Sequence, residues 1–184
     1  MKRLFDVLVS GFLLLLAAPF MMLIALAIKL DSPGSVIYKQ ERAGRFGELF
    51  KMYKFRSMVS GADKIGEYFT MPGDARVTKV GAFLRKSSLD ELPQLVNVLT
   101  GDMSLVGPRP DVAAQRDYYT DEEWTLRHTL RPGITGLAQA TVRSDTTIEE
   151  RKALDLEYVK KSSLFYDLII IMKTAKQIIF KGSY

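Results

Sequence analysis

The sequence predicts a helix-rich α/β domain that is attached to a membrane by its first 30 residues. An uncharged run occupies residues 7–28, and short extended segments follow it between residues 36 and 58. Helical segments with amino-terminal capping patterns make up much of the remainder. Because 184 residues suit a single globular unit, we expect a membrane helix at 1–30 and one domain at 31–184.

The uncharged run has the length of a membrane segment. Its 22 residues would form a helix of roughly 33 Å, close to the ~30 Å thickness of a bilayer's hydrocarbon core. A cleaved signal peptide is the alternative, since Lys2 and Arg3 precede the run. The apolar stretch is long for a signal peptide, however, and no small-x-small cleavage pattern follows it.

Pro19 lies near the middle of this segment and predicts a break or kink in the helix. Both flanks are basic, and basic residues are retained in the cytoplasm. A re-entrant helix that enters and leaves by the cytoplasmic face satisfies both flanks, whereas a straight span with an external amino terminus satisfies only one. Both topologies remain open. The basic flanking residues are Lys2, Arg3, Lys29, Lys39, Arg42 and Arg45.

Two strands are expected at 36–40 and 50–58, joined by a glycine-containing turn at 44–47. If the second segment is extended, Lys54 and Arg56 project from the same face.

Four helices are expected after the strands. The pattern Ser88-x-x-Glu91 predicts a capping box opening a helix at 88–99, and Thr120-x-x-Glu123 predicts another for a helix running towards residue 131. A third helix is expected at 148–161. The last, at 164–181, carries an apolar stripe and several lysines, so it is either an amphipathic helix in the membrane interface or an ordinary core helix.

Composition narrows the chemistry. The net charge of +5 indicates an anionic partner: nucleic acid, anionic lipid or a phosphorylated substrate. The absence of cysteine excludes a thiol nucleophile and thiolate zinc sites. His128 has no serine or cysteine motif to support a catalytic triad, and no Walker A, GxGxxG or HExxH pattern occurs. Carboxylates, arginines and glycine-rich turns remain, which is typical of phosphate chemistry with a divalent cation.

Asp90 and Glu91 are the sharpest candidates for this chemistry. In the simpler interpretation they only cap a helix. Arg85 and Lys86 precede them, however, and a helix amino terminus attracts phosphate and keeps a carboxylate ionised. Adjacent helical side chains point about 100° apart. One carboxylate could therefore attack phosphorus while the other holds a hard cation.

Two further segments are candidates for binding phosphate. Prolines on both sides restrict the backbone at Arg109, whose guanidinium matches phosphate oxygens bidentately. The segment 131–136 (RPGITG) predicts a tight turn whose glycines let backbone amides approach an anion. Plain structural turns remain the alternative for both.

Four motifs in order resemble the bacterial sugar transferase family: KFRSM at 54–58, SLDEL at 88–92, GDMSLVGPRP at 101–110 and RPGITGLAQ at 131–139. Length and the amino-terminal segment are similar to its small monotopic phosphoglycosyl transferases. The chain departs from the family at Ala18, where serine is common before the proline. It also departs at Leu137, often tryptophan, and at 141–143 (TVR), often Asn-Gly-Arg.

The resemblance implies a catalytic domain on the cytoplasmic face of the bacterial inner membrane. It would move a sugar-1-phosphate from a UDP-sugar to undecaprenyl phosphate and release UMP through a covalent aspartyl-phosphosugar. Mg²⁺ or Mn²⁺ is the implied cofactor, and membrane lipids and downstream glycosyltransferases are implied partners, with no nucleic acid. Direct single-step transfer and a non-catalytic scaffold on anionic lipid are the rival hypotheses.

Asp90 matches the family nucleophile. Glu91 matches the acidic partner associated with the metal, and the resemblance implies that Glu91 and Asp90 hold the metal together. The resemblance assigns the remaining site positions to substrate phosphates: Lys54, Arg56, Ser57, Arg85, Arg109, Arg131, Thr135, Gln139 and Arg143.

Overall fold

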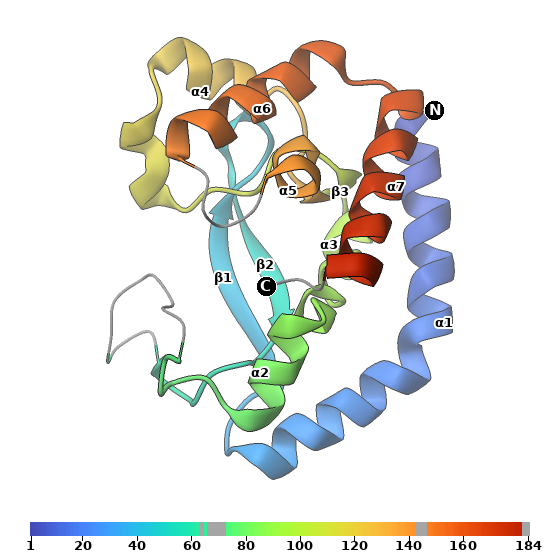
Figure 1. The fold of residues 1–184 in the computed structure, drawn as a ribbon, viewed down its shortest axis with the longest axis vertical. Coiled ribbons are helices and arrows are strands. Elements are labelled where there is room, and N and C mark those ends of the chain that lie inside the picture. The colour runs from blue at the N-terminus through green and yellow to red at the C-terminus, as the bar shows by residue number, and fades with distance from the viewer. Residues whose placement is uncertain (63–64, 66–72, 143–146, 182–184) are drawn as a thin grey trace.

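A computed structural model describes residues 1–62, 65, 73–142 and 147–181, and it has the helix-rich α/β architecture expected (Figure 1). The helices are α1 (Lys2–Asp31), α2 (Lys79–Lys86), α3 (Gln94–Thr100), α4 (Asp121–Arg127), α5 (Leu137–Thr141), α6 (Ile148–Lys161) and α7 (Leu164–Lys181). The strands are β1 (Ile37–Ala43), β2 (Leu49–Phe55), β3 (Ser104–Val106) and β4 (Gly133–Thr135). Short 3-10 turns are η1 (Arg45–Gly47), η3 (Leu89–Glu91) and η4 (Ala113–Tyr118).

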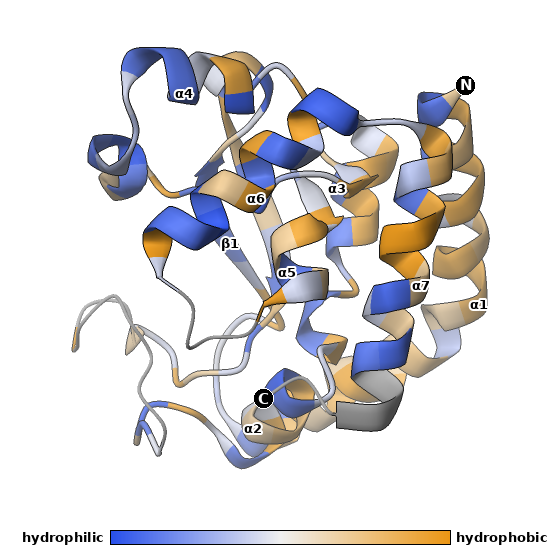
Figure 2. Ribbon diagram, turned by 45° about the horizontal axis from the view of Figure 1, so that its top comes forward, coloured by the Kyte–Doolittle hydropathy of each residue, from blue (hydrophilic) through white to orange (hydrophobic). Residues whose placement is uncertain are grey.

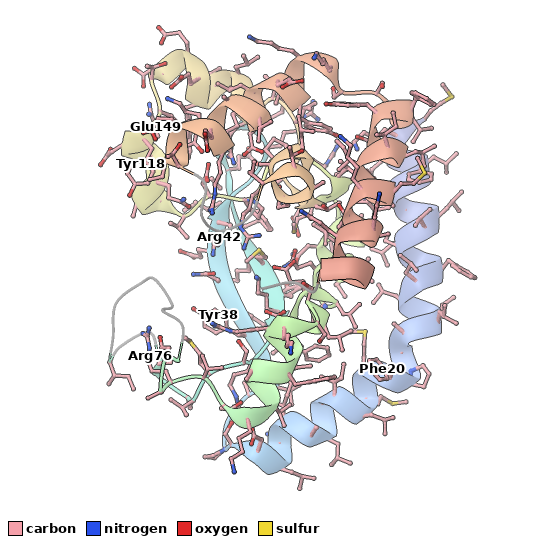
Figure 3. All side chains as sticks on the ribbon, in the orientation of Figure 1. Phe20, Tyr38, Arg42, Arg76, Tyr118 and Glu149 are labelled. Atoms are coloured by element: carbon pink, nitrogen blue, oxygen red, sulfur yellow. The ribbon has the colours of Figure 1, made fainter. Side chains whose placement is uncertain are left out.

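Helix α1 bends but does not break. Its hydrogen-bonded helix runs through Pro19, so the expected interruption is a kink inside one 30-residue element. Figure 1 shows the bend, and Figure 3 places Phe20 beside it. Only 11% of its most apolar 18-residue window is buried, which leaves most of the apolar surface uncovered by the protein.

Both halves of α1 nevertheless contact the rest of the protein. The first half packs on α3 and β3, and the second half packs on α2. Ile24 and Ile28, near its carboxyl end, are buried with Phe55 of β2 and Leu84 of α2. The helix therefore touches one globular body near both of its ends.

Two small sheets carry the site. Strands β1 and β2 form the predicted antiparallel hairpin, with Tyr38 opposite Lys54 and Arg42 opposite Phe50. Strands β3 and β4 pair in parallel, with Ser104 opposite Gly133. A Cβ added at Gly107, Gly133 or Gly136 would collide with backbone of the facing segment. Gly133 in β4 and Gly136 just before α5 thus serve close backbone packing against the segment around Gly107, which corrects the expectation of a tight turn at 131–136.

The main core lies between α3, β3, α5, α6 and α7. Four of its side chains are fully buried and belong to a single hydrophobic cluster: Val98, Met103, Tyr158 and Ile170. Burial of side chains this large contributes about 1.5–3 kcal/mol each, so the core holds the two sheets in fixed positions relative to α3.

The expected helices at 148–161 and 164–181 are confirmed as α6 and α7. The helix expected at 88–99 is wrong in its first half: a 3-10 turn covers 89–91, and α3 starts only at Gln94. Ser88 has φ 55° and makes no capping hydrogen bond, so the capping box is absent. The second capping box does form, although its helix α4 ends at Arg127 and falls short of residue 131.

The carboxyl-terminal helix buries a narrower stripe than the sequence suggests. Asp167 and Ile170 face the core, while Phe165, Leu168 and Met172 are exposed. Figure 2 shows apolar residues of α7 and α1 on neighbouring helices at one side of the molecule, away from α4. This side is therefore the apolar side of the protein.

Candidate active site

The acidic pair lies in the tight turn η3, between α2 and α3. Ser88 enters the turn in the left-handed conformation that L-residues rarely adopt, and Pro93 follows it before α3 begins. The backbone N–H of Glu91 donates to the Ser88 carbonyl over 3.2 Å. This irregular backbone turns Asp90 inwards, where it is only 8% exposed.

Burial governs the ionisation of Asp90. Loss of water raises the pKa of its carboxyl to about 6, and the neighbouring Glu91 charge adds to this rise. Lys54 and Arg85 oppose the shift. The expectation that a helix amino terminus alone keeps Asp90 ionised is therefore corrected, because the residue precedes α3 within an irregular turn. It still ionises below neutral pH.

Glu91 has the opposite character. Burial acts to raise the pKa of its carboxyl, but Lys54, Arg109 and a hydrogen bond from Gln94 together lower it. The Lys54 ammonium donates to Glu91 Oε1 over 2.7 Å. Glu91 is therefore a permanent carboxylate at neutral pH, held by a cation from β2.

A second pair of predicted site residues meets next to this turn. Arg85, at the end of α2, donates through Nε to the Ser57 hydroxyl over 2.8 Å. Ser57 is buried, and its position is fixed because Gly81 of α2 packs directly on its backbone. The charge of Arg85 reaches Asp90 and lowers that carboxyl's pKa.

The segment 107–111 lies across from Glu91. Its prolines Pro108 and Pro110 are buried, while Arg109 is exposed. The charge of Arg109 lowers the pKa of Glu91, which places the guanidinium within electrostatic reach of the acidic pair. A small cavity lies between this segment and the β1–β2 hairpin. Its charged and amide side chains are Arg42, Lys54, Glu91, Gln94 and Arg109.

Four of the predicted phosphate-binding residues thus lie around the acidic pair or bond to its neighbours: Lys54, Ser57, Arg85 and Arg109. Arg56 does not join them. Its guanidinium donates to the carbonyls of Ser32 and Ile28 at the end of α1, so Lys54 and Arg56 contact different elements despite their spacing. Its Nε and Nη1 are buried with no hydrogen-bond partner.

The residues of the last motif are placed elsewhere. Arg131 donates to the Gly101 carbonyl over 2.6 Å, at the end of α3 that is remote from Asp90. The Thr135 hydroxyl pairs with Thr174 of α7 at 2.7 Å. Gln139 lies on α5 with both amide atoms buried and without a hydrogen-bond partner. Arg143 lies outside the described residues.

Arg42 is a cavity residue that the sequence did not single out as a ligand. It donates to Gln40 Oε1 over 2.6 Å and to the Pro110 carbonyl over 3.0 Å, so its guanidinium is fixed between the hairpin and the 107–111 segment. The sequence marked Arg42 only as one of the basic residues that flank the membrane segment, and that signal reports no contact across the fold.

The acidic pair fits a divalent cation of the magnesium type. Mg²⁺ is usually held by one or two protein carboxylates together with substrate phosphates. Asp90 and Glu91 supply two such ligands, and their mutual repulsion, which raises the Asp90 pKa, is the kind of charge a cation relieves. Among the described residues, no group of three or more His, Cys, Asp or Glu side chains lies together as a metal site.

Known proteins are similar to the chain over almost its whole length. UDP-glucose:undecaprenyl-phosphate glucose-1-phosphate transferases of Escherichia coli and Caulobacter vibrioides are 47% and 45% identical over 99% and 97% of the chain. The undecaprenyl-phosphate galactose phosphotransferase of Salmonella typhimurium is 41% identical over the whole chain. The chain spans 40%, 69% and 42% of these three relatives, respectively. The bacterial sugar transferase model matches residues 1–181, and the chain therefore belongs to that family.

Proposed function

We propose that this protein transfers a sugar-1-phosphate from a UDP-sugar to undecaprenyl phosphate and releases UMP, with Asp90 as nucleophile. The observation that carries the proposal is the buried Asp90, which lies within electrostatic reach of Lys54 and Arg85 and beside an ionised Glu91 that Arg109 also reaches. A carboxylate with a pKa of about 6 is charged at neutral pH yet poorly hydrated, which suits a nucleophile. A lipid-binding scaffold would gain nothing from burying such a group.

The first half-reaction expels UMP. An Asp90 carboxylate oxygen forms a bond to the sugar-bearing phosphorus while the bond from that phosphorus to the bridging oxygen breaks. UMP leaves with the bridging oxygen and its electron pair, and an aspartyl phosphosugar remains. Arg109, and Arg42 beside it in the cavity, supply positive charge for the phosphate oxygens.

The second half-reaction releases the product. A phosphate oxygen of undecaprenyl phosphate bonds to the same phosphorus, and the bond from phosphorus to Asp90 breaks. The carboxylate is restored and a lipid-linked diphosphosugar leaves, on which downstream glycosyltransferases would act. The nucleotide and the lipid therefore never need to occupy the site together.

Glu91 and Asp90 would hold Mg²⁺ or Mn²⁺ in this scheme. The bound cation would supply charge neutralisation between the donor diphosphate and the attacking carboxylate. Lys54 keeps Glu91 ionised and oriented for that role, through the 2.7 Å ion pair.

The membrane arrangement is part of the proposal. We infer that α1 is re-entrant and that α7 lies in the interface at the cytoplasmic face of the inner membrane. Support comes from the bend at Pro19, from the contacts of both α1 ends with one body, and from the exposed apolar residues of α7.

The relatives' names leave the sugar open, since glucose and galactose enzymes are similarly close. The test is UMP release by the purified chain in detergent micelles with undecaprenyl phosphate. UDP-glucose, UDP-galactose and UDP-N-acetylgalactosamine would each be offered, with and without excess EDTA. We expect one donor to yield UMP only with the cation present. No release from any donor would refute the proposed activity, and undiminished release in EDTA would refute the metal role of Glu91.

A further inference from the structure

The loop that presents Arg109 is held by its backbone on every side. Gly133 N–H donates to the Pro108 carbonyl over 2.9 Å, and Ala43 N–H donates to the Asp111 carbonyl over 2.8 Å. Arg42 donates to the Pro110 carbonyl over 3.0 Å. These bonds hold the residues on both sides of Arg109, whose own side chain is exposed.

The Arg109 carbonyl is bound by a buried arginine. Arg127, the last residue of α4, is 3% exposed, and its Nη2 donates to the Arg109 carbonyl over 2.6 Å. The same guanidinium forms ion pairs with Asp111 and with Asp155 of α6, the latter over 2.7 Å. Tyr119 covers its face, with the ring centroid 5.3 Å from the guanidinium carbon.

A buried triad of charges is costly to assemble. Each ion loses its hydration on burial, and hydrophobic replacements of such groups are often neutral or stabilising. Stability alone therefore gives little reason to bury one cation and two carboxylates between α4, α6 and the loop. Figure 1 shows α4 and α6 packed over one end of the β1–β2 hairpin. What this triad specifies is geometry, because a guanidinium fixes three acceptors in one plane.

We propose that Arg127, held by Asp111 and Asp155, is a positioning residue that sets Arg109 for the donor's diphosphate. This inference rests on the proposed function. Asp155 on α6 accepts from Nε and Nη2, Asp111 in the loop accepts from Nη1, and Nη2 donates in addition to the Arg109 carbonyl. Arg109 then meets the phosphate with its backbone already ordered, which lowers the entropy lost on binding.

The test compares Arg127→Lys with Arg109→Ala and the double variant. An ammonium keeps the charge but cannot serve both aspartates and the carbonyl. We expect Arg127→Lys to raise the KM for the UDP-sugar donor at least tenfold while kcat changes less. In the Arg109→Ala background, adding Arg127→Lys should change kcat/KM by less than twofold, because the residue it positions is gone. Asp155→Asn, which keeps the shape of the cluster, should give a smaller rise in KM with the same dependence on Arg109.

Lys152→Met is the matched control. Lys152 and Glu123 form a half-exposed ion pair, 2.9 Å long, between the same two helices, without touching the loop. The Lys152→Met variant should leave the donor KM unchanged, even if its unfolding temperature falls as much as that of Arg127→Lys. The inference is overturned if folded Arg127→Lys and Asp155→Asn keep the wild-type KM, or if their effects multiply with that of Arg109→Ala. Failure of the proposed function is separate, since it appears as a wild-type protein that uses no UDP-sugar.

Discussion

Asp90 and Glu91 are neighbours in the chain, yet their surroundings shift their pKa values in opposite directions. Burial and the nearby Glu91 charge raise the pKa of Asp90 to about 6, while Lys54 and Arg109 bring the pKa of Glu91 down. Two carboxylates in different environments are suited to different tasks. The poorly hydrated one fits attack on phosphorus, and the firmly ionised one fits a cation.

Replacing Arg109 by lysine tests whether geometry or charge matters there. We expect Arg109→Lys to lose at least 90% of kcat/KM for the donor, because an ammonium cannot form two parallel bonds to a phosphate. UMP release measures this, with Arg45→Lys, an arginine outside the cavity, as control. A fully active lysine variant would reduce Arg109 to a structural part of its turn.

His128 is a buried residue of the fold and does not line the cavity that holds Glu91 and Arg109. It is 4% exposed and packs against Trp124, with the tilted rings 3.9 Å apart between centroids, and its Nδ1 lies 2.8 Å from the Trp124 carbonyl. A carbonyl only accepts, so Nδ1 carries the proton and Nε2 does not. Nε2 is buried without a partner, and burial lowers the pKa of the ring to about 4.

This histidine makes stability depend on pH. The pKa of His128 is the ordinary 6.5 in the unfolded chain and about 4 in the folded protein. As pH falls from 7 to 4, protonation therefore favours the unfolded state and stability decreases. Thermal unfolding in micelles should show this fall, and His128→Gln should flatten it. Equal slopes for wild type and variant would contradict the account.

At the residue scale, the acidic pair and Arg109 were predictable because their motifs are local. Arg56 was not, since its partners Ser32 and Ile28 come from the end of α1. Arg127 was missed for the same reason. Nothing in its own sequence neighbourhood indicates that Asp111 and Asp155 meet it, because three separate elements bring them together.

Among the elements, α1 is fastened to the domain by polar contacts as well as apolar ones. Asp6 is 2% exposed and accepts from the Ser104 hydroxyl over 2.8 Å and from the Leu105 N–H over 3.2 Å. Arg3 donates to the Val98 carbonyl over 2.6 Å, and Lys2 pairs with Asp167. The basic residues at the amino terminus therefore bind α1 to α3 and α7, in addition to any effect on membrane topology.

Asp6→Asn should loosen this attachment. The amide NH2 of asparagine can only donate, so one of the two groups that now donate to Asp6 would lose its acceptor. A buried polar group without a partner lowers the free energy of unfolding by about 1–3 kcal/mol. We expect a lower unfolding temperature in micelles. Leu8→Ala, on the exposed side of the same helix, should leave that temperature nearly unchanged. An Asp6→Asn protein as stable as wild type would show that the buried contacts are dispensable.

The two capping patterns show where element prediction succeeds. Thr120 and Glu123 exchange both capping bonds, at 3.0 and 3.2 Å, because α4 begins on an open surface. Ser88 and Glu91 have the same spacing, but Lys54 takes the Glu91 carboxylate and Ser88 is left-handed. A tertiary ion pair has replaced a local bond at the site, which no local pattern reports.

At the scale of the whole molecule, the position of both α1 ends bears on topology. The amino end contacts β3 and α3, and the carboxyl end contacts α2, on one body (Figure 1). A straight span would place these ends on opposite sides of a ~30 Å hydrocarbon layer. A bent, re-entrant helix lets both contacts form.

Cysteine labelling tests this arrangement cleanly, since the chain contains no cysteine. A cysteine inserted after Met1 and another replacing exposed Lys29 should both react with an impermeant maleimide only from the cytoplasmic side. Phe20→Cys, at the bend, should be shielded from either side. Labelling of the amino-terminal cysteine from the periplasm would refute re-entry.

The most direct test of the central claim is the mass of the intact protein after incubation with its UDP-sugar and Mg²⁺, without lipid acceptor. Our account predicts an added sugar phosphate on wild type, located to Asp90 by peptide mapping, absent from Asp90→Asn, and lost on adding undecaprenyl phosphate. An unmodified protein that still transfers the sugar phosphate when both substrates are present would contradict it and establish direct transfer.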